Sequence, residues 1–302
     1  MCDVQGNNSS WECVKGGCFQ LCFLHISVVR KKNMDIVCFL FIFFILILLY
    51  LHYRQQFDCV EHIHIYEMYY TNKKDLFLKC DIKQPIVIDA TSEFIDDNLI
   101  RELHWDSYIY ALARQPTLNL VDLNDLVDLK DSSIALPFST SQDIMQYMPR
   151  YISMNNDTFL KETGMLKSYK EIGQYFKPNF TWTEEYDICY ARETSVIPFQ
   201  YHTSSYKFIC ILRGSIVVKM TEFRHCEWLK KNQRSPPPPP PHIEIAEIEL
   251  GKKQMLYIPP YCMYSIFFQE PETCFCEFQY ETVFHWLSHT THAISQMCSV
   301  NQ

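Results

Sequence analysis

The chain has 302 residues, of which 48% are hydrophobic and 15% aromatic, and its formal net charge at pH 7 is −8. The part after residue 53 carries 23 basic and 32 acidic side chains. This acidic part repels a phosphate backbone, so we expect no nucleic-acid partner. Its roughly 250 residues are enough to bury the core of one large domain or of two small ones.

A long apolar run near the N-terminus is the first predicted element. Residues 36–51 read IVCFLFIFFILILLYL, and His52 and Tyr53 extend the run before Arg54 ends it. Apolar side chains occupy every helical face, and a bilayer core of about 30 Å needs roughly 20 helical residues. No small-x-small cleavage site follows, as a signal peptide would require. We therefore predict a transmembrane helix within residues 34–54, a single-pass membrane location and the lipid bilayer as a partner.

The side of the membrane that carries the rest of the chain stays open. A basic cluster at residues 30–32 precedes the helix, and the positive-inside rule then places the N-terminus in the cytoplasm. If translation begins at Met34 instead, the cluster is absent and Arg54 becomes the nearest charge, so the large domain faces the cytosol. Residues 1–33 look like no domain and are predicted to be disordered.

Residues 55–82 are predicted to be a juxtamembrane linker, and residues 83–302 a single folded domain. The first part of this domain is mixed. Residues 85–89, PIVID, are typical of a short buried strand. The spacing of apolar residues predicts three helices, over residues 92–105, 140–148 and 158–169.

From residue 187 onwards the hydrophobic period changes to two, which indicates strands. Strands are predicted over residues 188–192, 206–213, 215–222, 243–250, 254–258, 264–268 and 273–281, and a final helix over residues 283–297. A Pro-rich loop at residues 235–242 contains six consecutive prolines and is predicted to be an extended surface connection. Short strands with tight turns and no helices between them favour a closed or double-sheet β structure.

Nine of the fourteen cysteines follow the apolar run. Their number is odd, no C-x-x-C pair occurs, and a domain of this size folds without disulfides. Several lie within predicted apolar strands, where a free cysteine behaves as a small hydrophobic residue. We therefore predict mostly free thiols.

The predicted strands resemble those of a known family. Residues 206–219, YKFICILRGSIVVK, resemble the middle of a cupin or JmjC-like domain, where a glycine turn joins two strands. Residues 249–252, ELGK, and 256–266, LYIPPYCMYSI, resemble that family's later glycine turn and the segment after it. Residues 84–88 resemble its opening strand. The resemblance implies a mainly β fold with flanking helices, namely a double-stranded β-helix (cupin or jelly roll) preceded by one transmembrane helix.

The chain is also similar to membrane-anchored cupin-like proteins of large nucleocytoplasmic DNA viruses. The shared features are the N-terminal anchor, the stretch NDTFLKETG at residues 156–164, the YDI strand at Tyr186 and the LYIPPY-x-x-YSI block. This similarity implies a viral protein in a host or virion membrane.

In active JmjC-type enzymes a His-x-Asp/Glu pair and a distal histidine hold Fe(II), with 2-oxoglutarate and dioxygen in the open positions. The resemblance places His202 at the first ligand position, but Ser204 stands at the carboxylate position and Tyr264 at the distal position. Counted back from Gly214, His202 is also one residue out of register, which would point it to the other face of its strand. No iron, no 2-oxoglutarate and no catalytic residue are therefore expected.

The predicted function is that of a membrane-anchored, non-catalytic cupin-like domain, a pseudoenzyme that serves as a binding or structural module. Its partner would be an unidentified protein or small molecule. Tyr257, Tyr261 and Tyr264 are candidates to line a ligand site at the barrel mouth, or else to fill the barrel. The alternative is an Fe(II)/2-oxoglutarate-dependent hydroxylase with an atypical metal site that includes His202. A third candidate is a metal-free binder of sugars or lipid head groups.

Two further clusters of possible metal ligands are present. His285, His289 and His292 fall on one face of the predicted final helix and could hold zinc, but a solvated helix face is the favoured interpretation because no carboxylate lies near them. Cys274 and Cys276 share one face of a predicted strand, where packing is the favoured interpretation.

Overall fold

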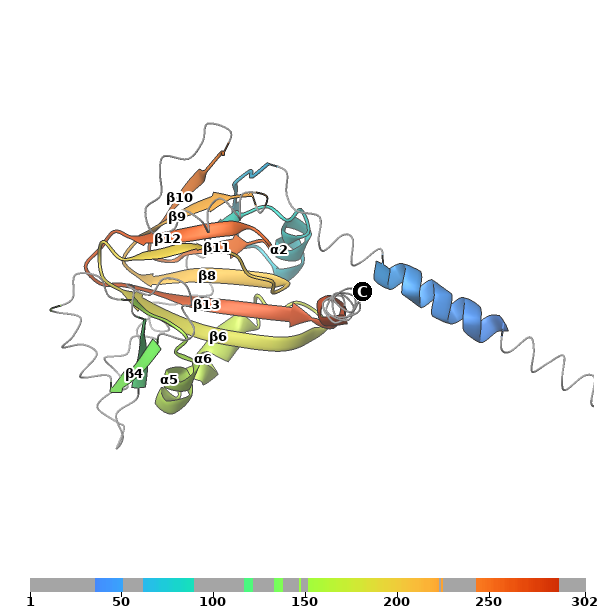
Figure 1. Ribbon diagram of the computed structural model, residues 1–302, viewed down its shortest axis with the longest axis horizontal. Coiled ribbons are helices and arrows are strands. Elements are labelled where there is room, and N and C mark those ends of the chain that lie inside the picture. Colours follow the sequence, from blue (N-terminus) through green and yellow to red (C-terminus); the bar gives the residue numbers. More distant parts are fainter. Residues whose placement is uncertain are drawn as a thin grey trace, which may run out of the picture. The chain divides into compact units, whose positions relative to one another are not determined.

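The computed structural model (Figure 1) describes residues 36–50, 62–89, 117–121, 133–137, 147, 152–222, 224 and 243–287. The chain divides into two compact units. The first is Met1–Arg54 and the second is Gln55–Gln302.

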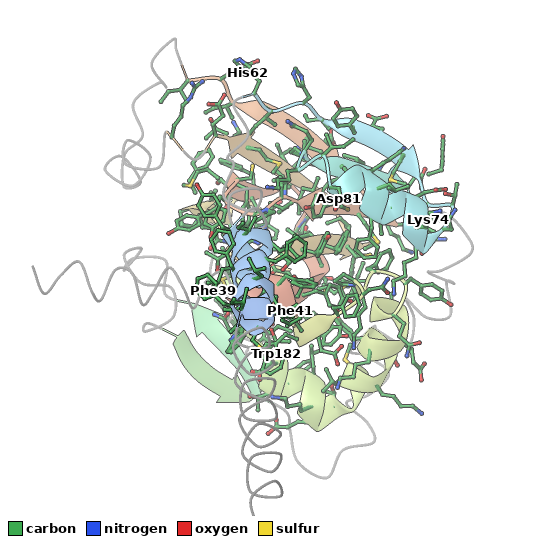
Figure 2. All side chains as sticks on the ribbon, turned by 90° about the vertical axis from the view of Figure 1, so that its right-hand side faces the viewer. Phe39, Phe41, His62, Lys74, Asp81 and Trp182 are labelled. Atoms are coloured by element: carbon green, nitrogen blue, oxygen red, sulfur yellow. The ribbon has the colours of Figure 1, made fainter. Side chains whose placement is uncertain are left out.

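In the first unit, residues 36–50 form a helix with almost entirely exposed side chains, among them Phe39 and Phe41 (Figure 2). The helix carries apolar side chains on every face, so it has no polar stripe. Among the helices of the described ranges, none combines the length and the apolar character needed to cross a bilayer. The predicted span at residues 34–54 extends beyond the described helix at both ends.

The second unit is mainly β and has two sheets, arranged like a β-sandwich (Figure 1). In spatial order, the nine strands of the larger sheet are β1 (Tyr66–Tyr69), β2 (Ile86–Asp89), β11 (Gln254–Ile258), β8 (Tyr206–Arg213), β13 (Thr273–Thr282), β6 (Thr181–Ala191), β5 (Ile152–Ser153), β3 (Thr117–Val121) and β4 (Ser133–Pro137). The four strands of the smaller sheet are β10 (Ala246–Leu250), β9 (Ile216–Thr221), β12 (Met263–Phe268) and β7 (Val196–Gln200). Neighbouring strands are antiparallel except β1 and β2, which are parallel.

Within the described residues, the helices of this unit are α2 (Lys73–Cys80), α5 (Asp157–Thr163), α6 (Met165–Gly173) and a short helical stretch at residues 283–287. Helix α2 begins after Asn72, whose side chain accepts a hydrogen bond from the backbone N–H of Asp75 at 3.0 Å. This is the contact expected of an N-cap asparagine. Lys74 and Asp81 mark the two ends of α2 in Figure 2.

The alternation of side chains along the strands separates two cores. On the outer face of the larger sheet, Phe208 and Phe278 pack with Tyr169 of α6 and with Phe176, which follows α6. On the inner face, residues such as Ile209 pack against the smaller sheet. Strands β8 and β13 are therefore covered on both faces. A polar side chain on their inner face lies inside the sandwich.

The predicted strands agree well with the observed ones. Those at residues 206–213 and 254–258 coincide with β8 and β11, and those at 215–222, 264–268 and 273–281 match β9, β12 and β13 to within one residue at each end. The predicted strand 243–250 contains the shorter β10, and the predicted strand 188–192 is the end of the longer β6. Residues 283–287 are helical as predicted, whereas residues 288–297, the predicted helix 92–105 and most of 140–148 lie outside the described residues.

Three sequence-based expectations need correction. The single helix expected at residues 158–169 is two helices, because Gly164 between them has a φ of +77°. Strand β7 was not expected, since Pro198 interrupts its pattern; it fits because β7 is an edge strand. Residues 62–82, expected to be linker, contain β1 and α2, and Leu76 and Cys80 of α2 are buried in the outer core. The folded part therefore begins well before residue 83.

Replacing Gly164 with alanine should lower the free energy of unfolding by about 1 kcal/mol. A Cβ atom at this position would meet nothing within 4 Å, so the cost comes only from the left-handed backbone. Urea denaturation of the full chain in detergent measures the effect. Unchanged stability would show that this backbone conformation is not needed between α5 and α6.

Candidate functional site

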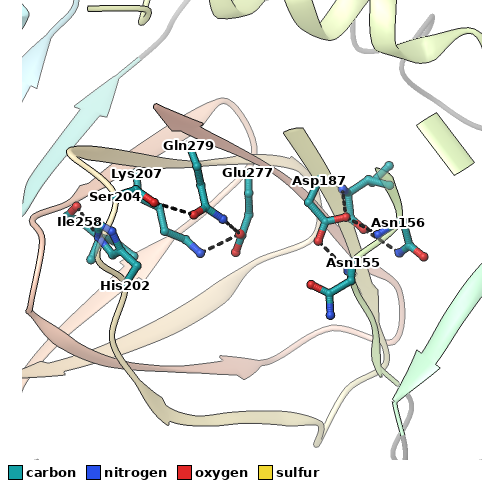
Figure 3. Close-up of polar contacts among 10 residues, drawn as sticks. Asn155, Asn156, Asp187, His202, Ser204, Lys207, Ile258, Glu277 and Gln279 are labelled. Atoms are coloured by element: carbon teal, nitrogen blue, oxygen red, sulfur yellow. Dashed lines mark hydrogen bonds and ion pairs between the residues drawn. The ribbon is translucent and has the colours of Figure 1, made fainter. Parts of the chain in front are cut away.

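A group of polar side chains interrupts the apolar core between the sheets. We call it the interior polar cluster, and it consists of His202, Ser204, Lys207, Tyr264, Glu277 and Gln279. Figure 3 labels all of these residues except Tyr264. Strand pairing brings most of it together, because Lys207 of β8 lies opposite Gln279 of β13 and Glu277 lies two residues further along the same face. The cluster is therefore a consequence of β-sheet register.

The centre of the cluster is an ion pair between Lys207 and Glu277. The Lys207 Nζ lies 2.7 Å from a Glu277 carboxylate oxygen, and the two residues are only 4% and 5% exposed. Burial opposes the charged form of Lys207, but the Glu277 carboxylate and then Tyr264 outweigh it and raise the lysine pKa. The same ammonium lies 5.4 Å from the centre of the Tyr264 ring, within reach of a cation–π contact. Lys207 is therefore a fixed internal cation.

A chain of hydrogen bonds joins Ser204 to this ion pair. The Ser204 hydroxyl donates to the side-chain oxygen of Gln279 at 3.0 Å, and the Gln279 amide donates to Glu277 at 3.3 Å. The Glu277 carboxylate thus accepts hydrogen bonds from both Lys207 and Gln279, which is the satisfaction that a buried charge requires.

His202 is a buried member of the cluster, with 7% exposure. Its Nε2 lies 2.9 Å from the carbonyl oxygen of Ile258, so Nε2 must carry the ring proton. Burial, followed by the nearby Lys207 charge, lowers the pKa of His202 to about 3. The imidazole is therefore neutral at physiological pH, and its ring packs edge-on against Tyr264 at 6.4 Å between ring centres.

Asp187 of β6 lies beside the cluster, directly opposite Glu277 in the strand register (Figure 3). Its carboxylate accepts hydrogen bonds from the backbone N–H groups of Asn155 and Asn156, which precede α5. Burial, followed by the charge of Glu277, nevertheless raises the pKa of Asp187 to about 7. Two carboxyl groups and one ammonium group therefore share the interior of the sandwich.

The raised pKa of Asp187 predicts a pH-dependent stability. An acid that holds its proton more tightly in the folded chain favours folding when protonated, so stability should fall as pH rises from about 4 to about 7. Asp187→Asn should flatten this slope in urea denaturation at a series of pH values. Asp157→Asn is the control, because Lys161 lowers the pKa of this exposed carboxyl group. Equal slopes for the parent chain and Asp187→Asn would contradict the assignment.

The three positions that the resemblance assigns to iron do come together, but their contacts do not fit Fe(II). The Nε2 of His202 is bonded to a carbonyl oxygen, the Ser204 hydroxyl is bonded to Gln279, and the Lys207 ammonium lies beside Tyr264. An ammonium group in this place repels a divalent cation. In the part of the chain that the structure describes, no three His, Cys, Asp or Glu side chains are grouped closely enough to hold a metal ion.

The three tyrosines predicted to line a ligand site do not share one surface. Tyr264 lies in the inner core, whereas Tyr257 lies on the opposite face of the larger sheet, with its hydroxyl 3.5 Å from the carbonyl oxygen of Cys80. Tyr261 stacks on Tyr201 and lines a cavity of about 10 Å³ next to Cys262, room for about one water molecule. Tyr257 and Tyr264 therefore pack in different cores.

The remaining predicted clusters are partly described. His285 is fully buried and its ring contacts the carbonyl oxygen of Thr203, while His289 and His292 lie outside the described residues. Cys274 and Cys276 pack in the outer core. All seven cysteines in the described ranges are free.

Sequence reasoning missed Lys207, Glu277 and Asp187 as members of the interior. One signal was present: alternation places each of them on the same face of its strand as apolar side chains of the inner core, namely Ile209, Phe275 and Cys189. Comparison of the sequence with models of known protein families and with curated proteins gives no match. The site must therefore be interpreted from its own chemistry.

Proposed function

We propose that this chain is a membrane-anchored cupin-like domain that has no iron-dependent activity and serves as a binding or structural module. The two-sheet fold supports the cupin-like part, since the strands that carry the resemblance are β8, β9, β11 and β12, on both sheets. The apolar helix at residues 36–50 supports the anchor.

The observation that carries the non-catalytic part is the buried pair of Lys207 and Glu277. The lysine ammonium supplies the positive charge that the Glu277 carboxylate needs, and it lies among the positions where the resemblance would place a metal ion. With Lys207 in place, the site has a permanent cation of its own. A metal ion would have to displace this ammonium and then find Ser204 and Tyr264 where carboxylate and imidazole ligands are required.

Energetics favour the same interpretation. A buried ion pair contributes little net stability, because desolvation offsets the attraction between the charges, and a well-packed apolar pair often does as well. A sandwich that needed only a stable core would have no use for Lys207, Glu277 and Gln279 on its inner face. Their presence supports an interior in which side chains of the protein, and not a bound metal ion, provide the polar groups.

Membrane extraction tests the anchor. After alkaline carbonate treatment of expressing cells, we expect the full chain to stay in the membrane pellet. A double variant, Phe43→Arg with Leu46→Arg, should move to the supernatant, because each arginine at the centre of a span costs about 3 kcal/mol. Phe180→Arg, at an exposed position of the second unit, is the matched control and should stay in the pellet. Release of the parent chain by carbonate would contradict the anchor.

A further inference from the structure

Both sheets of the sandwich end at the same groove. Strand β1 is one of the two edge strands of the larger sheet, and β10 is one of the two edge strands of the smaller sheet. Residues of both strands line the groove, which has a volume of about 590 Å³. This volume lies within the range of sites that bind small molecules.

The lining of the groove combines buried apolar side chains with acidic ones. Val87 and Ile248 are 8% and 5% exposed and belong to the inner core. Four carboxylate side chains also line the groove, namely Glu67, Asp89, Glu247 and Glu249. A ligand in this groove would therefore meet an apolar surface below it and negative charge around it.

The negative charge of the groove is only partly compensated. Glu247 pairs with Lys219 at 2.7 Å. Within the described residues, Glu67 and Glu249 form no ion pair. Like charges held close together attract a cationic partner and repel an anionic one.

The two edge strands carry acidic side chains but neither lysine nor proline. Edge strands commonly carry lysine or proline, which discourage the addition of another strand. Strand β1 reads YEMY and β10 reads AEIEL, with neither residue in either strand. Among the described strands, none pairs with the outer edge of β1 or β10. Among the described residues, these edges therefore offer backbone N–H and C=O groups with which an extended peptide can pair.

We propose that the groove binds an extended, basic segment of another polypeptide by strand addition. The partner's backbone pairs with β10, its apolar side chains pack on Val87 and Ile248 of the inner core, and its alternate lysine or arginine side chains lie on the face of β10 that carries Glu249. Glu67, which shares the face of Val87, adds negative charge to the groove. The proposal names a partner class for the binding module, but it rests on the groove alone. A test of peptide binding is therefore independent of the tests of membrane anchoring and of iron binding.

A fluorescein-labelled octapeptide of alternating lysine and valine is a direct probe. Its fluorescence anisotropy should rise saturably with purified full-length protein in detergent, and binding should weaken with added salt. A peptide of alternating glutamate and valine should not bind. Equal binding of the two peptides, or no binding of the lysine peptide, would overturn the proposal.

Two further comparisons test the geometry. The double variant Glu67→Lys with Glu249→Lys should bind the lysine peptide at least about tenfold more weakly. Glu171→Lys with Glu270→Lys changes the net charge equally at exposed positions outside the groove and should bind like the parent chain. N-methylation of alternate backbone amides of the peptide should also weaken binding about tenfold, because it removes strand pairing. An equal loss for the two double variants, or no effect of N-methylation, would refute strand addition in this groove.

Discussion

Replacing Lys207 with methionine should lower the free energy of unfolding by about 3–5 kcal/mol. Methionine keeps most of the volume of the lysine side chain, so the loss comes from charge rather than from packing. Glu277, only 5% exposed, would lose the ammonium at 2.7 Å and would remain in the core with the Gln279 amide as its main partner. Chemical denaturation of the full chain in detergent gives the measurement.

Two companion variants make this result specific to the buried pair. Lys207→Met combined with Glu277→Leu should recover most of the lost stability, because no charge is then left unpaired. Lys219→Met removes a lysine from the more exposed pair with Glu247, and it should cost less than about 1 kcal/mol. If Lys207→Met costs no more than Lys219→Met, the ion pair does not have the role assigned to it.

Replacing Phe176 with alanine should lower the free energy of unfolding by about 3–5 kcal/mol. Phe176 is fully buried, and its ring lies 5.7 Å from that of Tyr70, 5.6 Å from that of Phe208 and 6.1 Å from that of Phe278, between ring centres. It thereby joins the segment after α6, the end of β1 and the outer face of the larger sheet. Its removal leaves a cavity that these three rings cannot fill without moving.

The matched control for this prediction lies four residues away. Phe180 is 72% exposed and contacts Phe284 at 6.1 Å between ring centres. Phe180→Ala should change the stability by less than about 1 kcal/mol. Thermal unfolding of both variants, followed by circular dichroism, compares the two effects. A similar loss for both would show that Phe176 does not hold the helical segment to the sheet.

Much of the β architecture could be predicted because it depends on local signals. Strand β8 alternates between two apolar faces and ends before Gly214, whose φ is +77°, and β11 follows the turn after Gly251. Strand β7 could not be predicted in the same way, because the edge position that tolerates Pro198 is defined only by the completed sheet. Helix α2 is short and not strongly amphipathic, so local patterns predict a linker in this stretch and not a helix.

The interior polar cluster could be predicted only in part. The resemblance pointed to His202, Ser204 and Tyr264, and all three lie in or beside the cluster. The roles of Lys207 and Glu277 depend on the register that aligns β8 with β13, which joins residues 70 positions apart. Local sequence patterns do not reveal such long-range pairing. The sequence therefore indicated which iron ligands are replaced, but not the buried lysine that lies among their positions.

We propose that the interior of the sandwich holds the Lys207 ammonium in place of a catalytic metal. The most direct test of this proposal is the iron content of the full chain, purified without chelators and incubated anaerobically with Fe(II), together with turnover of 2-oxoglutarate. We predict less than about 0.1 iron per chain after gel filtration and no turnover above that of a buffer control. Stoichiometric iron, with turnover that His202→Ala abolishes, would contradict the proposal.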